Sequence, residues 1–143
     1  MPAMTDAQIE EFLAPTRQGI LLRTTRDGTA TGAPVWFDWD GVAVRCFSDA
    51  SAPKVRSIGR DPRISLLVVN ELDEAPAWVR FDGAAVLDHD GDVNRFAADV
   101  LAPRYWDLSK PELAATVDAW RAAPPGALVM IELRPERIRS STG

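Results

Sequence analysis

Two Asp-Gly dipeptides, Asp27-Gly28 and Asp40-Gly41, constrain the fold of this chain more than any other feature. Glycine adopts the positive φ that a tight hairpin turn demands, so each dipeptide predicts a reversal of the chain. The segments beside these turns are rich in Leu, Ile, Thr and aromatic residues or alternate apolar and polar residues, as strands do. We therefore predict three consecutive antiparallel strands in the first third of the chain.

The same signals predict six strands in all, at residues 19–25, 30–40, 42–48, 63–69, 77–87 and 127–133. Pro34 indicates an edge strand or a bulge, and Gly83 indicates a bulge. A capping box at Thr5–Gln8 opens a first helix that Pro15 ends. Further helices are predicted at residues 54–60, 90–101 and 110–122.

Without a repeat, a linker or alternating β-α units, these elements favour a single domain over residues 1–143. The expected architecture is an antiparallel barrel with helices packed outside. Apolar residues make up 46% and charged residues 26% of the chain, as in a globular protein. No apolar run approaches the roughly 20 residues that cross a bilayer, and the N-terminus does not resemble a secretory signal.

The formal net charge is -5 and the pI is near 4.8. This acidity argues against binding to nucleic acid or to an acidic membrane surface. The single cysteine excludes an internal disulfide bond and fits a reducing cytoplasm. We therefore expect a cytoplasmic protein.

Several kinds of catalytic site are not expected. One histidine and one cysteine argue against a His/Cys metal site. Residues 88–92 resemble a calcium loop, but the glycine stands at the fourth position rather than the sixth. His89 is interpreted as a surface residue and Cys46 as a packing residue, and the motifs of phosphate loops, dinucleotide folds and serine nucleophiles are missing. We expect a cofactor to carry any difficult chemistry.

Residues 53–63 carry four basic residues against one acidic residue, a local charge of +3. A loop of small residues leads into the predicted helix, whose first backbone N–H groups are free. Lys54, Arg56 and the hydroxyl of Ser48 or Ser51 add the donors that a phosphate site requires. The alternative interpretation is a solvated basic helix face.

Three motifs, taken in order and spacing, resemble a known family: Pro34-Val35-Trp36-Phe37, Ser48…Pro53-Lys54-Val55-Arg56 and Arg60-Asp61-Pro62-Arg63. They are similar to the flavin and deazaflavin oxidoreductases related to pyridoxamine 5'-phosphate oxidase, which share the FMN-binding split-barrel fold. The resemblance runs from about residue 17 to residue 85, with a weaker echo at residues 128–139. It implies a mainly β (α+β) fold, a six-stranded antiparallel split β-barrel with short flanking helices.

The resemblance also implies a homodimer with two cofactor sites at the subunit interface. Lys54 is expected to hold the cofactor phosphate, assisted by Ser48 and Arg56, with a further contact at Ser57, where many relatives have asparagine. The backbone of the second strand is expected to line the ring, and the neighbouring subunit to contribute two residues. The expected cofactor-binding residues are Val35, Trp36, Phe37, Ser48, Lys54, Arg56, Ser57, Trp78 and Arg80. No side chain stands out as catalytic.

Trp36 is expected either in the core or in the cofactor site, whereas Trp106 and Trp120 are expected in the core or an interface. The second strand lacks the arginine and lysine of true pyridoxamine phosphate oxidases; Ala33, Pro34 and Phe37 occupy that stretch. Pyridoxamine phosphate oxidation is therefore not expected.

The Val-Trp-Phe sequence of the second strand looks closest to the branch that uses the deazaflavin coenzyme F420. The leading hypothesis is a reductase that transfers a hydride from reduced F420 to an activated double bond in a small organic acceptor. The second is an FMN-dependent oxidoreductase on the same fold. The third is a non-catalytic protein that binds the coenzyme or a tetrapyrrole-like ligand.

Overall fold

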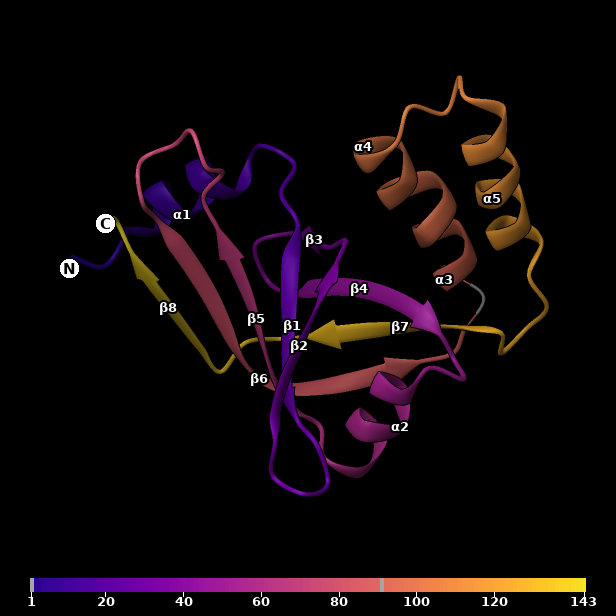
Figure 1. Ribbon diagram of the computed structural model, residues 1–143, viewed down its shortest axis with the longest axis horizontal. Coiled ribbons are helices and arrows are strands. Elements are labelled where there is room, and N and C mark those ends of the chain that lie inside the picture. Colours follow the sequence, from indigo (N-terminus) through magenta and orange to yellow (C-terminus); the bar gives the residue numbers. More distant parts are fainter. Residues whose placement is uncertain (1, 91) are drawn as a thin grey trace.

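A curled antiparallel sheet forms the body of the protein, and helices flank it (Figure 1). The computed structural model describes residues 2–90 and 92–143. The strands are β1 (Gly19–Thr24), β2 (Ala30–Val35), β3 (Asp38–Trp39), β4 (Val44–Asp49), β5 (Arg63–Val69), β6 (Trp78–Asp88), β7 (Leu128–Leu133) and β8 (Arg137–Ser141). The helical segments are α1 (Asp6–Leu13), α2 (Pro53–Arg60), α3 (Asp92–Arg95), η1 (Phe96–Leu101), α4 (Ala102–Tyr105) and α5 (Pro111–Ala122).

The sheet follows the order β2-β1-β5-β6-β7-β4-β3, and β8 pairs with β6 off this path. β6 joins the two parts of the barrel, because its first residues pair with β8 and its last residues pair with β7. β7 in turn pairs with β4, so it lies between β4 and β6. This antiparallel split barrel confirms the predicted fold class. In Figure 1, α3, η1, α4 and α5 gather on one side of the barrel and are called the helical lobe.

Gly83 lies in β6 where the pairing changes from β8 to β7. A Cβ atom there would lie 2.9 Å from the Leu133 side chain and 3.3 Å from the Arg134 carbonyl oxygen. The glycine is therefore required by close approach of the chain that connects β7 to β8. The predicted bulge is wrong, because β6 keeps an unbroken register with β5 through this position.

The structure has eight strands rather than the predicted six. The predicted strand at residues 30–40 divides at Trp36, because β2 pairs with β1 whereas β3 turns away to pair with β4. β8 escaped prediction because its sequence, Arg-Ile-Arg-Ser-Ser, is mostly polar and its stability comes from pairing with β6. β2 ends the sheet, which confirms that Pro34 lies in an edge strand.

The predicted capping box is present, since the Thr5 hydroxyl accepts from the Gln8 N–H and the Gln8 side chain accepts from the Thr5 N–H. The helix predicted at residues 90–101 includes Gly91, which lies outside the described residues. From Asp92 the helix continues beyond the predicted end to Tyr105, through the π-helical segment η1. This longer helix brings the end of α4 back to the barrel.

The barrel interior forms the main core, to which β1, β5 and β6 contribute side chains that are at most 2% exposed: Leu21, Leu66, Val68, Val79 and Phe81. A second core lies between the helical lobe and β7, made by Val93, Phe96, Leu101, Leu128 and Met130. Burial of these groups provides the main stabilisation of both parts. Within residues 2–90 and 92–143, no helix has the length and apolar character needed to span a membrane.

Candidate functional site

A groove runs along β2, the exposed edge strand, and Lys54 stands in its middle. It consists of two adjoining hollows that share the Lys54 side chain, with volumes of about 280 and 260 Å³. The first is lined by Leu21, Arg23, Thr31, Gly32, Ala33, Ala52, Pro53 and Lys54. The second is lined by Gln18, Pro34, Val35, Trp36, Phe47, Lys54, Trp106 and Trp120. We call the two together the Lys54 groove.

Lys54 is the second residue of α2, directly after Pro53. Proline suits this position because its fixed φ is helical and it lacks the N–H that would be unpaired there. Ala52 precedes the helix and gives it no side-chain cap. The start of α2 and the Lys54 side chain thus line the same hollow, which suits a phosphate group.

Arg56, Ser48 and Ser57 occupy supporting positions around this helix start. The exposed Arg56 donates from Nη1 to the Ser51 carbonyl oxygen at 2.6 Å, which holds the loop before α2. Ser48 is buried in β4 and its hydroxyl donates to the Asp49 carbonyl oxygen. Ser57 is buried on the inner side of α2. None of the three lines the Lys54 groove, so their expected contacts with a cofactor remain predictions.

Aromatic side chains form the far end of the groove. Trp106 and Trp120 are stacked, with ring centroids 5.4 Å apart and planes 17° from parallel. Both meet Trp36 edge to face, at 4.8 and 5.8 Å. Phe47 meets Trp120 at 5.1 Å. All four rings are half-buried. They therefore pack against one another, as expected for core aromatic residues, and still expose part of their surface to the groove.

Tyr105 connects the helical lobe to the groove. Its ring stacks on Trp36 at 4.9 Å, with planes 6° apart. Its hydroxyl donates to the Arg17 carbonyl oxygen at 2.5 Å and accepts from the Phe37 N–H at 3.2 Å. Burial raises the pKa of Tyr105, so the phenol remains protonated and able to donate. Tyr105 thereby fixes the backbone beside Trp36.

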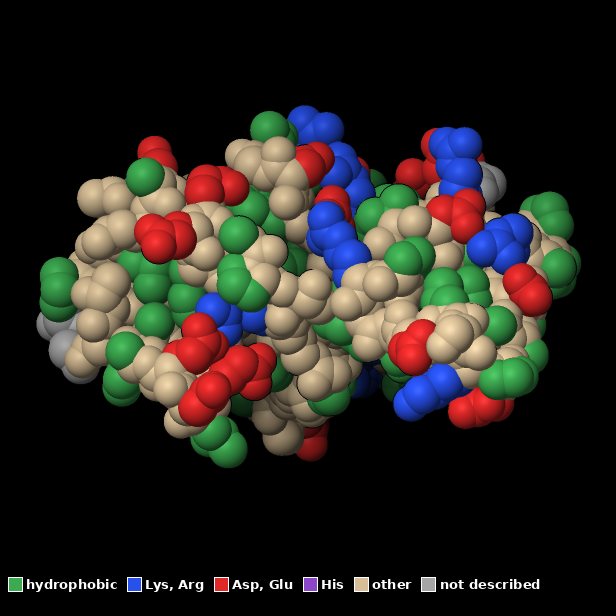
Figure 2. All heavy atoms as spheres, turned by 90° about the horizontal axis from the view of Figure 1, so that it is seen from above, with side chains coloured by type: hydrophobic (Ala, Val, Ile, Leu, Met, Phe, Trp, Pro, Cys, Tyr) green, Lys and Arg blue, Asp and Glu red, His purple; other side chains and the backbone are tan. Residues whose placement is uncertain are grey.

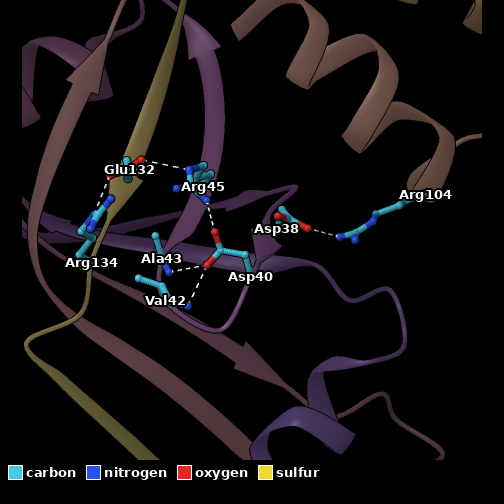
Figure 3. Close-up of polar contacts among 8 residues, drawn as sticks. All are labelled: Asp38, Asp40, Val42, Ala43, Arg45, Arg104, Glu132 and Arg134. Atoms are coloured by element: carbon cyan, nitrogen blue, oxygen red, sulfur yellow. Dashed lines mark hydrogen bonds and ion pairs between the residues drawn. The ribbon is translucent and has the colours of Figure 1, made fainter. Parts of the chain in front are cut away.

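A salt bridge joins α4 to Asp38, the residue that follows Phe37. Arg104 Nη1 lies 2.6 Å from Asp38 Oδ1, and Figure 3 shows Arg104 reaching from α4 toward Asp38. Residues 104–106 of the helical lobe therefore contact residues 36–38 in turn, where the chain passes from β2 to β3. These contacts fix the position of the aromatic end of the groove.

The turn after β3 is held independently of the lobe. Asp40 accepts from the backbone N–H groups of Val42 and Ala43, and Arg45 joins Asp40 to Glu132 of β7 (Figure 3). These donors lower the pKa of Asp40 to about 2. The predicted Asp40-Gly41 turn is therefore confirmed, with Gly41 at a φ of 92°.

Trp78 and Arg80 lie on β6, away from the Lys54 groove. Arg80 pairs with Asp82 at 2.7 Å, and Asp82 also accepts from Ser65 at 2.6 Å and from Arg137 at 3.4 Å. These partners lower the pKa of Asp82 to about 2. Within one chain the structure thus brings Val35, Trp36 and Lys54 together but leaves Trp78 and Arg80 apart.

Arg80 lines a larger hollow of about 590 Å³, which we call the arginine hollow. Its basic lining residues are Arg23, Arg63, Arg80 and Arg137, and Asp82 is its acidic one. Arg23, Thr31 and Gly32 line both this hollow and the Lys54 groove, so the two adjoin. Phe37 faces elsewhere, in a hollow beside α1 that Tyr105 and Arg104 also line.

On the face seen in Figure 2, charged side chains of both signs are mixed. The face that carries α1, α4 and α5 shows acidic side chains over both halves and a row of basic side chains between them (Figure 2). Such a mixed surface produces no extended field for a charged macromolecule.

Lys54 and Thr31 are the groove's lining residues that carry an amine or a hydroxyl, and no cysteine lines it. Cys46 is fully buried in β4, and burial raises the pKa of its thiol to about 12. No three His, Cys, Asp or Glu residues in the described part of the chain gather as a metal site would require. The arrangement can bind an elongated molecule that has a flat part and a phosphate.

Sequence reasoning missed Arg23 and Phe47 and assigned Trp106 and Trp120 to the core or an interface alone. Arg23 and Phe47 lie in ordinary strand patterns, so nothing local distinguishes them. Trp106 and Trp120 are fourteen positions apart, and only the turn between α4 and α5 makes their rings stack. The two tryptophans of the helical lobe, Trp106 and Trp120, were the one sequence signal that could have indicated an aromatic site there.

The comparisons with solved structures agree with this fold. The solved structure of a conserved hypothetical protein from Mycobacterium tuberculosis is similar, with a TM-score of 0.78 and 23% identity, over 97% of this chain and 85% of that chain. A structure described as an F420 reductase has a TM-score of 0.62 and 20% identity, over 94% and 96% of the chains. An FAD-binding protein from Mesorhizobium loti has a TM-score of 0.65 and 20% identity, over 97% and 93%.

A search of curated proteins gave no match. A model of the pyridoxamine 5'-phosphate oxidase family, in contrast, matches residues 5–141, nearly the whole chain. With the split barrel and the Lys54 groove, this match shows that the chain belongs to the pyridoxamine 5'-phosphate oxidase family.

Proposed function

We propose that this protein is an F420-dependent reductase that passes a hydride from the reduced deazaflavin to a small organic acceptor. The observation that carries the proposal is the continuity of the Lys54 groove with the arginine hollow. FMN ends at its phosphate, whereas F420 continues beyond its phosphate into a tail of glutamates. A site with arginines beyond the phosphate position favours the longer, more anionic cofactor.

The residues present fit the three parts of such a cofactor. Lys54 and the start of α2 suit the phosphate, and the unpaired edge of β2 at Val35 offers backbone groups to a ring that carries alternating carbonyl and N–H groups. Four arginines line the adjoining hollow against Asp82, and Glu136 pairs with one of them, Arg63, so the net charge there is +2, which suits carboxylates. When bound, F420 supplies the hydride; the chain binds it, orients it and excludes water.

The proposed assembly is a homodimer. The outer face of β1, β5 and β6 carries a row of half-buried apolar side chains: Ile20, Leu22, Leu67 and Trp78. A second copy packed on this face would cover the row and close over the arginine hollow, which Leu22 also lines, and would bring Trp78 of one subunit toward the groove of the other, whereas Arg80 would stay in the hollow of its own chain. In this arrangement Trp78 would lie beside a groove that it does not line within its own chain.

FMN is the second candidate cofactor, because a phosphate at Lys54 serves both cofactors and one similar structure is described as FAD-binding. Titration of the purified protein with F420 and with FMN, followed by fluorescence, separates them. Tighter binding of FMN than of F420 would overturn the proposal. Replacing Arg137 with alanine is expected to weaken F420 and leave FMN unchanged, because only F420 reaches the arginine hollow.

The two lysines of the chain, Lys54 and Lys110, provide a matched pair of variants. Loss of a charge-assisted contact costs about 1.5–3 kcal/mol, so Lys54→Ala is expected to weaken F420 binding roughly tenfold to a hundredfold. Lys110→Ala removes an exposed ammonium group before α5 and is expected to leave binding unchanged. Equal affinities in the wild type and Lys54→Ala would remove Lys54 from the phosphate site.

A further inference from the structure

The aromatic end of the Lys54 groove presents the partly exposed rings of Trp36, Trp106 and Trp120 to the hollow. Trp106 and Trp120 belong to the helical lobe, yet both line a hollow whose other side is β2. Their rings are half-buried and so retain surface that nothing in the chain covers. Aromatic surface of this kind in a concave site is a usual part of small-molecule binding sites.

The rings form two walls that meet at a right angle. Trp106 and Trp120 are stacked within 17° of parallel, and Trp36 stands at 88° to Trp106 and at 80° to Trp120. A flat ring can lie against one wall with its edge toward the other, in the stacked and edge-to-face geometries that aromatic pairs prefer. A bulky saturated molecule can use neither geometry.

Few of the side chains that line this hollow are polar. Gln18 and Lys54 are its polar lining residues, and the proposed function assigns Lys54 to the cofactor phosphate. The backbone of β2 is likewise assigned to the cofactor ring. The indole wall of the helical lobe, which faces that strand across the hollow, is left for the second reactant.

We propose that the hydride acceptor is a planar conjugated molecule, held against Trp106 and Trp120, and that the helical lobe therefore selects the substrate. The inference rests on the proposed function. The hydride adds both of its electrons to a carbon of the conjugated system, and a proton from water then neutralises the resulting anion. The deazaflavin is oxidised and the acceptor reduced by the same two electrons.

The wall is held in place by contacts outside the hollow. Arg104 pairs with Asp38, and Tyr105 bonds to the backbone of Phe37, and these two residues directly precede Trp106. Replacing Trp106 or Trp120 therefore changes the aromatic surface of the hollow but keeps the contacts that attach α4 to the barrel. This separation allows acceptor binding to be altered without altering the cofactor site.

Two neutral probes of equal skeleton test the inference: naphthalene-2-carboxamide, which is planar, and its saturated decahydro counterpart. Calorimetric titration of the full-length protein, with and without F420, measures the affinity of each. The planar amide is expected to bind at least tenfold more tightly. Trp106→Leu and Trp120→Leu are each expected to weaken it roughly threefold to tenfold. Trp39→Phe, whose indole contacts Glu10 outside the groove, is the control.

The comparison of the two amides on the wild type requires no variant, so a variant that fails to fold does not prevent the test. Equal affinities for the two amides would overturn the inference, as would unchanged affinity in both folded leucine variants. Competition between the planar amide and F420 would also overturn it, because the indoles would then hold the cofactor ring. Selective binding of the planar amide by a protein that binds no F420 would support the aromatic site and overturn the proposed cofactor.

Discussion

Replacing Tyr105 with phenylalanine tests how the lobe is attached to the barrel. The substitution keeps the ring that stacks on Trp36 but removes the hydroxyl that joins Arg17 to Phe37. Arg17 and Phe37 are 5% and 6% exposed, so the carbonyl and N–H that lose their partner lie where water has poor access. Leaving a buried polar group unpaired costs about 1–3 kcal/mol. We expect Tyr105→Phe to lose about 2 kcal/mol of stability, with a Tm roughly 5–10 °C lower.

Urea unfolding followed by tryptophan fluorescence measures this loss, and hydrogen exchange of the Phe37 amide locates it. Exchange at Phe37 is expected to accelerate, because its N–H has lost the Tyr105 oxygen. Thr116→Ala is the control, since it removes an exposed hydroxyl that donates to the Glu112 carbonyl oxygen of α5. It is expected to change stability by less than about 0.5 kcal/mol. A Tyr105→Phe protein as stable as the wild type would refute the role given to the hydroxyl.

Two further predictions concern β6. Gly83→Ala places a methyl group 2.9 Å from the Leu133 side chain and is expected to cost about 1–3 kcal/mol in urea unfolding; a wild-type midpoint would contradict the close approach. Asp82 has a pKa of about 2 in the folded protein against about 3.9 unfolded, so its stabilisation is present above about pH 5 and is lost as the pH falls toward 2. Asp82→Asn is expected to remove about 2 kcal/mol of that acid-dependent stability, and an unchanged pH profile would exclude Asp82 as its source.

Local chemistry made part of this structure predictable. The turns at Gly28 and Gly41 need a positive φ, and the start of α2 needs Pro53, so each was visible in a few consecutive residues. The position of Lys54 followed from the same short segment. These features are decided by the backbone preferences of the residues themselves.

Other features depend on partners far away in the chain and could not be predicted. The two residues of β3 form a strand only because β4 pairs with them, and β8 forms because β6 offers a free edge. The indole wall arises from a helical turn that places Trp106 on Trp120. No short segment contains the information for such contacts, since tertiary packing decides them.

The position of β7 determines when this barrel can close during synthesis. β7 is the only strand that joins β4 to β6 among those described, and it follows the whole helical lobe in the sequence. During synthesis on the ribosome, the edges of β4 and β6 that pair with β7 therefore remain unpaired until the chain beyond α5 has emerged. Open strand edges are templates for aggregation, so a nascent chain that stalls within α5 is the form of this protein most dependent on chaperones.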